Sequence, residues 1–342
     1  MKKKVKVALI GAGRIGFLLE KDPKRIKPAS HFGMWYNNNS VNFVAVCDTN
    51  ISRKNDLKKI DNKINFYSNP KKLLQIEKPD IVSISTWKDT HFKICKLCIE
   101  QGIKVIVMEK PLANNIQQSI ELIKLIKKKK VKVLINHRRR FDTEVIKLSK
   151  QIKNGIIGNL RQVSCFYVYG ILTTGTHLID TLRMLLKETA GDINKVIGIK
   201  NKFSSFFPKD DENIDGVLKF KNGLKAHIQS LNIKDYDIFD IDIYGTKGKI
   251  KLTNIGRSIL HYKIINSPEH SSFTELSNKA KNLCKDKPRK QFQLLAQNAL
   301  ACLKNKKAKP LCDAYDSHKD MIIIDKLINS SKKNSKLMKI KF

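Results

Sequence analysis

The first part of the chain alternates short apolar runs with segments in which apolar residues recur every three or four positions. Five runs are apolar on both faces of an extended chain, as strands buried on two sides require; they span residues 4–10, 41–48, 80–86, 103–109 and 131–136. Helical periodicity separates several of them, at residues 69–76, 90–102 and 115–130. This order predicts a parallel sheet covered by helices on both faces.

The second half of the chain has a different pattern. Longer segments with polar and apolar residues in alternation predict strands within residues 158–170, 193–204, 215–231 and 237–252, the last two folded at the turns KNG and GTKGK. Asp240 and Asp242 alternate with apolar residues, so this strand has one polar face. Helical patterns return at 176–188, 287–305 and 314–333. We therefore expect a mainly antiparallel sheet with helices.

Two domains follow from this change of pattern and from a length of 342 residues. We predict a first domain at 1–130 and a second at 131–342, whose last helix, at about 313–331, is a candidate to pack back on the first domain. The opening MKKKVKVALIGAG imitates a signal peptide, but its apolar segment is short and lacks a small-residue cleavage site. No apolar run approaches the ~20 residues that span a bilayer. We expect a cytoplasmic protein without membrane association.

The formal net charge of +36 raises the question of a nucleic-acid partner. Only ten of the 67 basic residues are Arg, the side chain best suited to reading phosphates and bases, and the lysines are scattered along the chain. This favours a generally lysine-rich composition over nucleic-acid binding. An anionic substrate remains compatible with the charge.

The seven cysteines form no repeated pattern. Cys95 and Cys98 make a CxxC within a helical segment, where they are expected to be small packing residues rather than a redox pair. No group of His, Cys and carboxylate residues shows the spacing of metal ligands, so no metal is expected.

A glycine-rich turn, GAGRIG, follows the first predicted strand. Gly11 permits the tight turn, Gly13 allows the backbone to approach a pyrophosphate, and Gly16 allows a helix to pack closely on the strand. A helix is expected to follow directly, with its N-terminus facing the phosphates. The residues of this dinucleotide-binding turn are Gly11, Gly13, Arg14, Ile15 and Gly16.

Asp48 ends the second predicted strand and is placed to accept hydrogen bonds from an adenosine ribose, which favours NAD over NADP. It lies farther from the glycines than the ~20 residues usual for this motif. The extra length is a helix-loop insertion at 19–40, which brings His31 and Trp35 as candidates near the site. Arg53 follows Asp48 and could meet a 2′-phosphate, so NADP remains possible.

Four motifs in this order resemble one family: GAGRIG, STWKDTHFKICKLCIEQGIKVIVMEKPLA, NHRRRFD and GTHLIDTLRMLL. Together they are similar to the glucose–fructose oxidoreductase, inositol dehydrogenase and MocA family. The resemblance implies an N-terminal Rossmann domain and a C-terminal α/β domain with a large, open, mainly antiparallel sheet. It also implies NAD(P)-dependent hydride transfer at a carbinol or ketone carbon of a sugar, sugar nucleotide or cyclitol.

The resemblance also assigns roles to individual residues. Lys110 corresponds to the family's catalytic lysine, Glu109 orients it or contacts the cofactor, and Pro111 forms a cis peptide bond. His177 corresponds to a second catalytic residue acting as acid and base. Asp180 lies one turn further on the same helix face, where it would hold the imidazole or bind substrate.

Thr173 departs from the family's pattern, which has an aspartate four residues before the histidine. A threonine cannot act as a carboxylate base but can bind a hydroxyl group, so it is retained as a substrate-binding candidate. This departure makes inositol less suitable as substrate. The surrounding residues 169–186 are more similar to relatives in surface-polysaccharide biosynthesis and nucleotide-sugar pathways.

Further candidates follow the predicted strands. Thr86 and His91 are expected near the cofactor, with His91 capping or packing rather than reacting, and Asn136 is expected on the nicotinamide side. Arg139, in the run 138–140, could bind an anionic substrate or form a structural ion pair. Tyr169, which alternates with Tyr167, is a substrate candidate with core packing as the alternative.

Two other classes of function stay open. A non-catalytic NAD-binding redox sensor is compatible with Thr173, and a basic nucleic-acid-binding protein with the charge. The main hypothesis is an NAD(P)-dependent dehydrogenase or reductase of a small sugar or nucleotide-sugar substrate. Relatives are often homodimers or homotetramers that associate through the C-terminal sheet, so the same is expected here.

Overall fold

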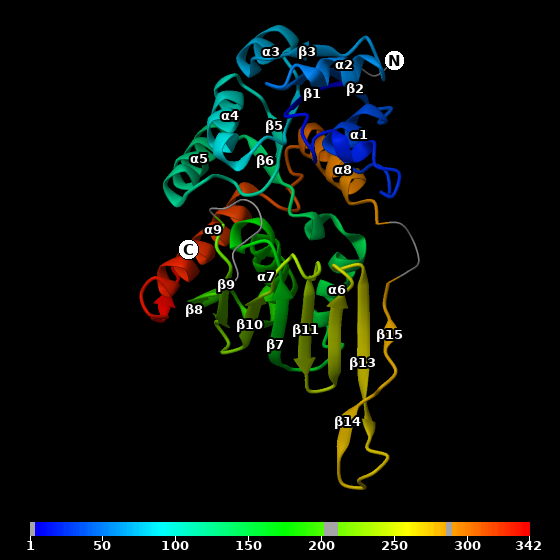
Figure 1. The fold of residues 1–342 in the computed structure, drawn as a ribbon, viewed down its shortest axis with the longest axis vertical. Coiled ribbons are helices and arrows are strands. Elements are labelled where there is room, and N and C mark those ends of the chain that lie inside the picture. The colour runs from blue at the N-terminus through cyan, green and yellow to red at the C-terminus, as the bar shows by residue number, and fades with distance from the viewer. Residues whose placement is uncertain (1–3, 202–210, 285–288) are drawn as a thin grey trace. The chain divides into compact units, whose positions relative to one another are not determined.

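The computed structural model describes residues 4–201, 211–284 and 289–342. The chain forms two compact units, Met1–Asp142 with Pro288–Met321, and Thr143–Lys287 with Ile322–Phe342 (Figure 1). The ends of two predicted elements, at 202–204 and 287–288, lie outside the described residues. We predicted a boundary at residue 130, with the last helix as a candidate to return to the first domain; the chain crosses after Asp142, returns to the first unit at Pro288 and to the second at Ile322.

The first unit contains six parallel strands in the order β3-β2-β1-β4-β5-β6. They are β1 Val5–Ile10, β2 Val41–Cys47, β3 Asn65–Tyr67, β4 Ile81–Ile84, β5 Val105–Met108 and β6 Lys132–Ile135. β4 and β5 are buried along their whole length, as the apolar runs predicted. The strand order reverses between β1 and β4, and such sheets bind ligands at the carboxyl ends of the strands flanking this point.

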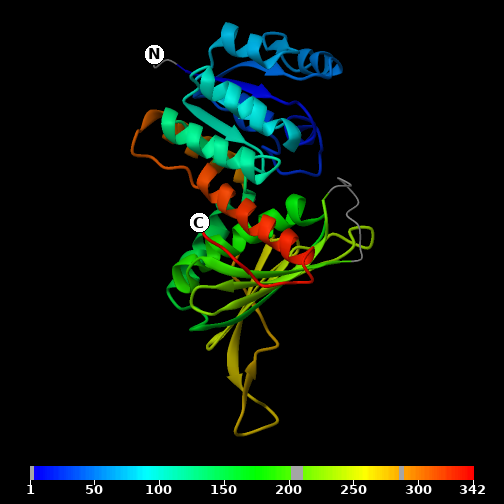
Figure 2. The same ribbon diagram turned by 90° about the vertical axis from the view of Figure 1, so that its left-hand side faces the viewer.

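Helices cover both faces of this sheet. α3 (Pro70–Glu77), α4 (Lys88–Glu100) and α5 (Ile116–Lys129) lie side by side on one face, and α1 (His31–Tyr36) and α8 (Gln291–Lys304) lie together on the other (Figure 1). Figure 2 shows α4 and α5, in cyan to green, from their outer side. Asn69 and Asn115 cap α3 and α5 by accepting hydrogen bonds from backbone N–H groups of the first turn. α2 (Ser52–Lys58) contributes Leu57 to a cluster with Phe32 of α1.

We expected a helix directly after the glycine turn, and this prediction is wrong, because no continuous helix follows the turn. Turns cover residues 14–17, the short 3-10 helix η1 covers Leu18–Glu20, and α1 begins only at His31. The N–H groups of His31 and Phe32 donate to the carbonyl oxygens of Ile15 and Gly16, at 3.1 and 2.8 Å. In a continuous helix those donors would come from residues 19 and 20. The helix is therefore interrupted by a twelve-residue excursion, residues 19–30, and then resumes.

The excursion is closed by its own polar contacts. The Glu20 carboxylate accepts hydrogen bonds from the Ala29 backbone N–H and the Ser30 hydroxyl, at 2.9 and 2.8 Å. Lys27 donates to the carbonyls of Leu19, Glu20 and Asp22, and a cis peptide bond joins it to Pro28. Pro23 and Pro28 lack the N–H that a continuous helix requires, so this segment cannot remain helical.

The second unit contains a mainly antiparallel sheet in the order β14-β13-β12-β11-β7-β10-β9-β8-β16, with β15 beside β13. Only the β7–β10 pairing is parallel among the pairings described. The strands are β7 Leu160–Tyr167, β8 Ile193–Lys200, β9 Ile214–Phe220, β10 Lys225–Ser230, β11 Asp240–Gly245, β12 Gly248–Thr253, β13 Ser258–Asn266, β14 Thr274–Leu276, β15 Lys281–Asn282 and β16 Met338–Lys339. The far end of β13 and β14 forms an arm (Figure 1).

One face of this sheet is buried by helices, and the other carries polar side chains. α6 (Thr143–Lys153) and α7 (Thr176–Ala190) pack together, and their apolar residues share one core with alternate residues of the strands. The polar face predicted at β11 carries ion pairs between Asp242 and Lys249 and between Asp240 and Lys251, at 3.0 and 3.4 Å. The predicted alternation therefore matches a sheet with two different faces.

α9 (Ala314–Ser331) contributes to both units: residues up to Met321 belong to the first and those from Ile322 to the second. Its second half packs into the core of the second unit, where a Cβ on Gly198 would overlap the carbonyl oxygen of Leu327. In the described part of the chain, no helix has both the length and the apolar character required to cross a bilayer.

Candidate functional site

The glycine turn lies at the carboxyl end of β1 and contacts the carboxyl end of β4. Gly11 has a φ of +96°, and a Cβ there would come within 2.7 Å of the Ser85 backbone. The Ser85 hydroxyl donates to the Gly11 carbonyl at 2.7 Å, and a Cβ on Gly16 would overlap the same carbonyl. A Cβ on Gly13, in contrast, would meet no atom within 4 Å. Gly11 and Gly16 are thus required by the fold, whereas Gly13 leaves open space, which fits the close approach of a phosphate.

Asp48 follows β2 and faces this turn. One oxygen of its carboxylate accepts from the Ala12 backbone N–H at 2.6 Å, and the other accepts from Asn50 N–H at 2.8 Å. The carboxylate is therefore fixed beside the glycine turn and partly exposed. Gly16 and Asp48 are 32 residues apart, and omitting the twelve-residue excursion leaves 20, the spacing usual for the motif.

Arg53, which we considered for a 2′-phosphate, is held by another carboxylate. It donates to Asp56 at 2.8 Å, and Lys21 of the excursion binds the same carboxyl group at 2.8 Å. Hydrogen bonds from these two cations lower the pKa of Asp56. Arg53 and Lys21 therefore share one anion, the Asp56 carboxylate.

A buried cluster follows β5. The Glu109 carboxylate accepts from His31 Nε2 at 2.9 Å and from Asn136 Nδ2 at 2.6 Å, and all three residues are buried. Burial by itself raises the pKa of Glu109, but the hydrogen bonds from His31 and the Asn136 amide and the charge of Lys110 outweigh it and lower the pKa to about 2. Glu109 is thus ionised. Asn136 ends β6 and Glu109 ends β5, so the parallel sheet itself brings them together.

Lys110 and the cis Lys110–Pro111 bond come next, as the resemblance implied. The Pro111 carbonyl lies 2.7 Å from Nδ1 of the buried His91, and His91 Nε2 lies 3.1 Å from the Thr86 carbonyl. Burial lowers the pKa of His91, against the opposing effect of these two carbonyls. His91 therefore joins the loops that follow β4 and β5. The two neighbours of Lys110 are each held by a buried histidine.

The loop after β4 exposes an aromatic side chain. Trp87 precedes the first residue of α4 and is 69% exposed, while the hydroxyl of Thr90 bonds that of Thr86 at 2.7 Å. Thr86 is thus at the carboxyl edge beside Gly11, where a Cβ on that glycine would come 2.8 Å from the Thr86 nitrogen. The structure brings Thr86, His91, Glu109, Lys110 and Asn136 to one edge with the glycine turn.

The arginine run after β6 is partly engaged. Residues Arg138–Phe141 form the short helix η2, in which Arg138 bonds Gln291 at 3.0 Å and Arg140 pairs with Asp316 at 3.2 Å. Arg139 lies between them and is half-buried. Arg138 and Arg140 thus have structural partners, and for Arg139 both a substrate contact and a structural ion pair stay predictions.

In the second unit, a π-helical turn, Ile171–Gly175, leads into α7. The Asp211 carboxylate caps this turn by accepting from the backbone N–H groups of Leu172 and Thr173, at 2.8 and 2.7 Å. A carboxylate thus lies beside Thr173 although position 173 has none. Sequence reasoning missed Asp211 because it comes from a segment 38 residues later that carries no motif.

His177 and Asp180 lie in the first turns of α7, with Asp180 buried and His177 half-buried. Tyr167 ends β7 in the core, where its hydroxyl donates to the Ile214 carbonyl at 2.7 Å. Tyr169 lies beyond the strand with a φ of +68° and is half-buried. The expected alternation of the two tyrosines on one strand is therefore wrong, because β7 ends before Tyr169.

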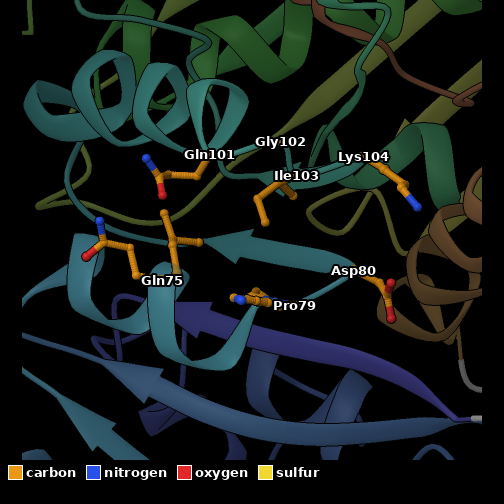
Figure 3. Close-up of a pocket in the computed structure, with 9 residues that line it drawn as sticks. Gln75, Pro79, Asp80, Gln101, Gly102, Ile103 and Lys104 are labelled. Carbon is orange, nitrogen blue, oxygen red and sulfur yellow. The ribbon is translucent and has the colours of Figure 1, made fainter.

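A cavity of about 420 Å³ lies at the opposite edge of the first sheet, where β4 and β5 begin (Figure 3). Gln75, Asp80, Gln101 and Lys104 are among its lining residues. Because the glycine turn and Lys110 lie at the carboxyl edge, this cavity is not part of the candidate site. The thiols of Cys95 and Cys98 are free and buried within α4, and burial raises the pKa of each.

Comparison with protein families gives two matches along the chain. Residues 5–137 match the family described as an oxidoreductase family with an NAD-binding Rossmann fold, and residues 169–251 match the GFO/IDH/MocA C-terminal domain. The first range contains the glycine turn, Asp48 and Lys110, and the second contains Thr173 and His177.

Individual relatives extend over most of the chain. D-glucoside 3-dehydrogenase of Escherichia coli (strain K12) is 22% identical over 276 residues, which cover 71% of this chain and 75% of that protein. Myo-inositol 2-dehydrogenase of Thermotoga maritima is 25% identical over 266 residues, or 73% and 76%. The WlbA dehydrogenase of Bordetella pertussis, solved with NADH and UDP-GlcNAcA, has the same fold with a TM-score of 0.76 and 16% identity, covering 99% of this chain and 100% of that chain.

Proposed function

Because the chain belongs to the GFO/IDH/MocA oxidoreductase family and contains its NAD-binding Rossmann fold, we propose that it transfers a hydride between NAD and a secondary alcohol or ketone carbon of a sugar, nucleotide sugar or cyclitol. One observation carries this proposal: Lys110 follows the buried, ionised Glu109 at the carboxyl edge of the sheet, beside the glycine turn. Bound NAD supplies the hydride acceptor.

Each group has a distinct role in this scheme. Lys110 takes or returns the proton of the reacting hydroxyl, and Glu109 with Asn136 holds the lysine loop. His177 is the second acid–base group, and Asp180 orients it. Thr173, Arg139 and Tyr169, which offer a hydroxyl, a guanidinium and a phenol, bind the substrate.

We further propose that the substrate is a nucleotide sugar. The support is the net charge of +36, which suits an anionic substrate, and the solved WlbA dehydrogenase that binds UDP-GlcNAcA. Asp48, fixed beside the turn by Ala12, supports NAD over NADP, because its anionic carboxylate would repel a 2′-phosphate. A cytoplasmic location, a part in polysaccharide biosynthesis and a homodimer or homotetramer remain predictions; size-exclusion chromatography with light scattering tests the last.

The test compares Lys110→Met with Lys104→Met. Both lysines adjoin β5, but Lys104 precedes the strand and is exposed at the opposite edge. With a panel of nucleotide sugars and free sugars followed by NADH absorbance, Lys110→Met is expected to lose at least about 100-fold in kcat while retaining NAD affinity. Lys104→Met is expected to behave like the wild type.

Three outcomes would contradict the proposal. Turnover by Lys110→Met at the wild-type rate would remove Lys110 from the mechanism. A wild-type protein that binds NAD but turns over no member of the panel would favour the non-catalytic redox sensor. Salt-dependent retention of DNA in a gel shift at physiological salt would instead favour nucleic-acid binding.

A further inference from the structure

A chain of buried side chains links helix α1 to the lysine loop. Trp35 Nε1 donates to the Ser83 hydroxyl oxygen at 2.7 Å, and that oxygen lies 3.2 Å from His31 Nδ1. His31 Nε2 lies 2.9 Å from the Glu109 carboxylate. Trp35, Ser83 and His31 are fully buried, and Glu109 is 8% exposed. We call Trp35, Ser83 and His31 the α1 relay.

The direction of every hydrogen bond in the α1 relay follows from its first member. An indole nitrogen can only donate, so the Ser83 oxygen accepts from Trp35. Ser83 has one hydroxyl proton, and among the described residues its only other side-chain partner is His31 Nδ1. The hydroxyl therefore donates to Nδ1, which leaves the imidazole proton on Nε2. That N–H donates to Glu109, whose ionised carboxylate can only accept.

A doubly protonated His31 would not satisfy these groups equally well. Its Nδ1–H would have to donate to the Ser83 oxygen, which already accepts from Trp35, and the hydroxyl proton of Ser83 would lose its acceptor. The His31 ring also lies edge-on against the ring of Phe292, with centroids 5.5 Å apart. The contacts therefore select the neutral Nε2–H tautomer.

We propose that the α1 relay is a positioning device that holds His31 as the neutral Nε2–H tautomer, so that Glu109 is oriented by a hydrogen bond but its negative charge stays available to Lys110. This role deepens the proposed function. The expected effect on kcat rests on that function, whereas the expected tautomer of His31 does not. The other charged groups that act here are Arg138, which interacts with Glu109, and His91, which interacts with Glu109 and Lys110. His31 and Trp35 are one helical turn apart on α1, so one helix face presents both to β4.

The first test observes the tautomer directly. Long-range ¹H–¹⁵N correlation spectra of the ¹⁵N-histidine-labelled protein, which has eight histidines, are assigned for His31 by its loss in His31→Gln. The proposal expects an unprotonated Nδ1 and a protonated Nε2 in the wild-type protein. A His31 ring that carries its proton on Nδ1, or on both nitrogens, would overturn the proposal, whether or not a substrate is found.

The second test removes hydrogen-bonding groups of the α1 relay. Trp35→Phe removes the only obligate donor while keeping an aromatic ring, and Ser83→Ala removes the middle member. Either change is expected to leave His31 with a mixture of the two tautomers. It is also expected to lower kcat by about 2- to 10-fold, the rate equivalent of one net hydrogen bond, with the KM for NAD unchanged.

Ser119→Ala is the matched control, because Ser119 is also a buried serine bonded to an imidazole, at 2.6 Å from His318 Nδ1 on another face of the same unit. It is expected to leave both the His31 spectrum and kcat unchanged. Equal losses of kcat in Ser83→Ala and Ser119→Ala, with an unchanged His31 spectrum in Trp35→Phe, would show a structural role only and overturn the proposal.

Discussion

Gly13→Ala separates cofactor binding from folding within a single motif. Its backbone lies outside the left-handed region, and an added Cβ would meet no atom within 4 Å. The apoprotein should therefore tolerate the methyl group, and replacing glycine by alanine should stabilise it by roughly 0.4–1 kcal/mol through the unfolded state. If the pyrophosphate of NAD approaches Gly13, the same methyl group should weaken NAD binding at least about tenfold.

The magnitude is best measured through ligand-linked stability. At an NAD concentration of 100 times the wild-type Kd, bound cofactor stabilises the wild type by about 2.7 kcal/mol. A tenfold weaker Kd reduces this to about 1.4 kcal/mol at the same concentration by the same relation. Urea unfolding with and without NAD measures both quantities, and fluorescence titration with NADH measures the affinity independently.

Gly16→Ala is the control within the same turn. Its Cβ would overlap the Gly11 carbonyl and come within 2.7 Å of the Ser85 hydroxyl, so it should destabilise the apoprotein by about 1–3 kcal/mol. A Gly13→Ala protein that binds NAD as tightly as the wild type would refute the placement of the phosphates at Gly13. An apoprotein destabilised as much as Gly16→Ala would refute the open geometry at that position.

Three further predictions concern other links of the structure. Asp48→Asn should lower kcat/KM for NAD about tenfold and reduce the ratio of kcat/KM for NAD to that for NADP, both measured by steady-state kinetics. The reason is the loss of the negative charge that repels a 2′-phosphate. The pKa of Glu109 is lowered to about 2, so the unfolded chain takes up this proton first, and stability should fall as pH drops from about 5 toward 2; Glu109→Gln should lack that part of the slope in urea unfolding at each pH. Gly198→Ala should destabilise the protein by about 1–3 kcal/mol in thermal or urea unfolding, because its Cβ would overlap the Leu327 carbonyl.

The parallel sheet was predictable because its signal is local. Each strand buried on both faces must be apolar at nearly every position, and β1, β4 and β5 are. α4, α5 and α7 begin within two residues of the predicted positions for the same reason: their periodicity lies within one segment. Short elements such as β3 and β16, of three and two residues, carry no period and were not predicted.

The interrupted helix shows where local reasoning ends. The unusual distance from the glycines to Asp48 predicted an insertion, and residues 19–40 were identified as its place. The points where the chain leaves and rejoins the helix depend on hydrogen bonds from His31 and Phe32 to Ile15 and Gly16. No sequence period encodes bonds between segments that far apart. The bond between the Thr173 N–H and the Asp211 carboxylate was not predicted for the same reason, because 38 residues separate the two.

The excursion and the lysine loop are connected through α1. The first N–H groups of α1 bond to the glycine turn, while the side chain of its first residue, His31, bonds to Glu109. α1 is only six residues long and could not hold this position by its own helical stability. Its position is set instead by bonds at both ends of the site. The turn expected to bind phosphates and the loop of Lys110 are therefore parts of one hydrogen-bonded unit. The twelve inserted residues leave that unit intact, because His31 and Phe32 bond to the Ile15 and Gly16 carbonyls, which residues 19 and 20 would bond in a continuous helix.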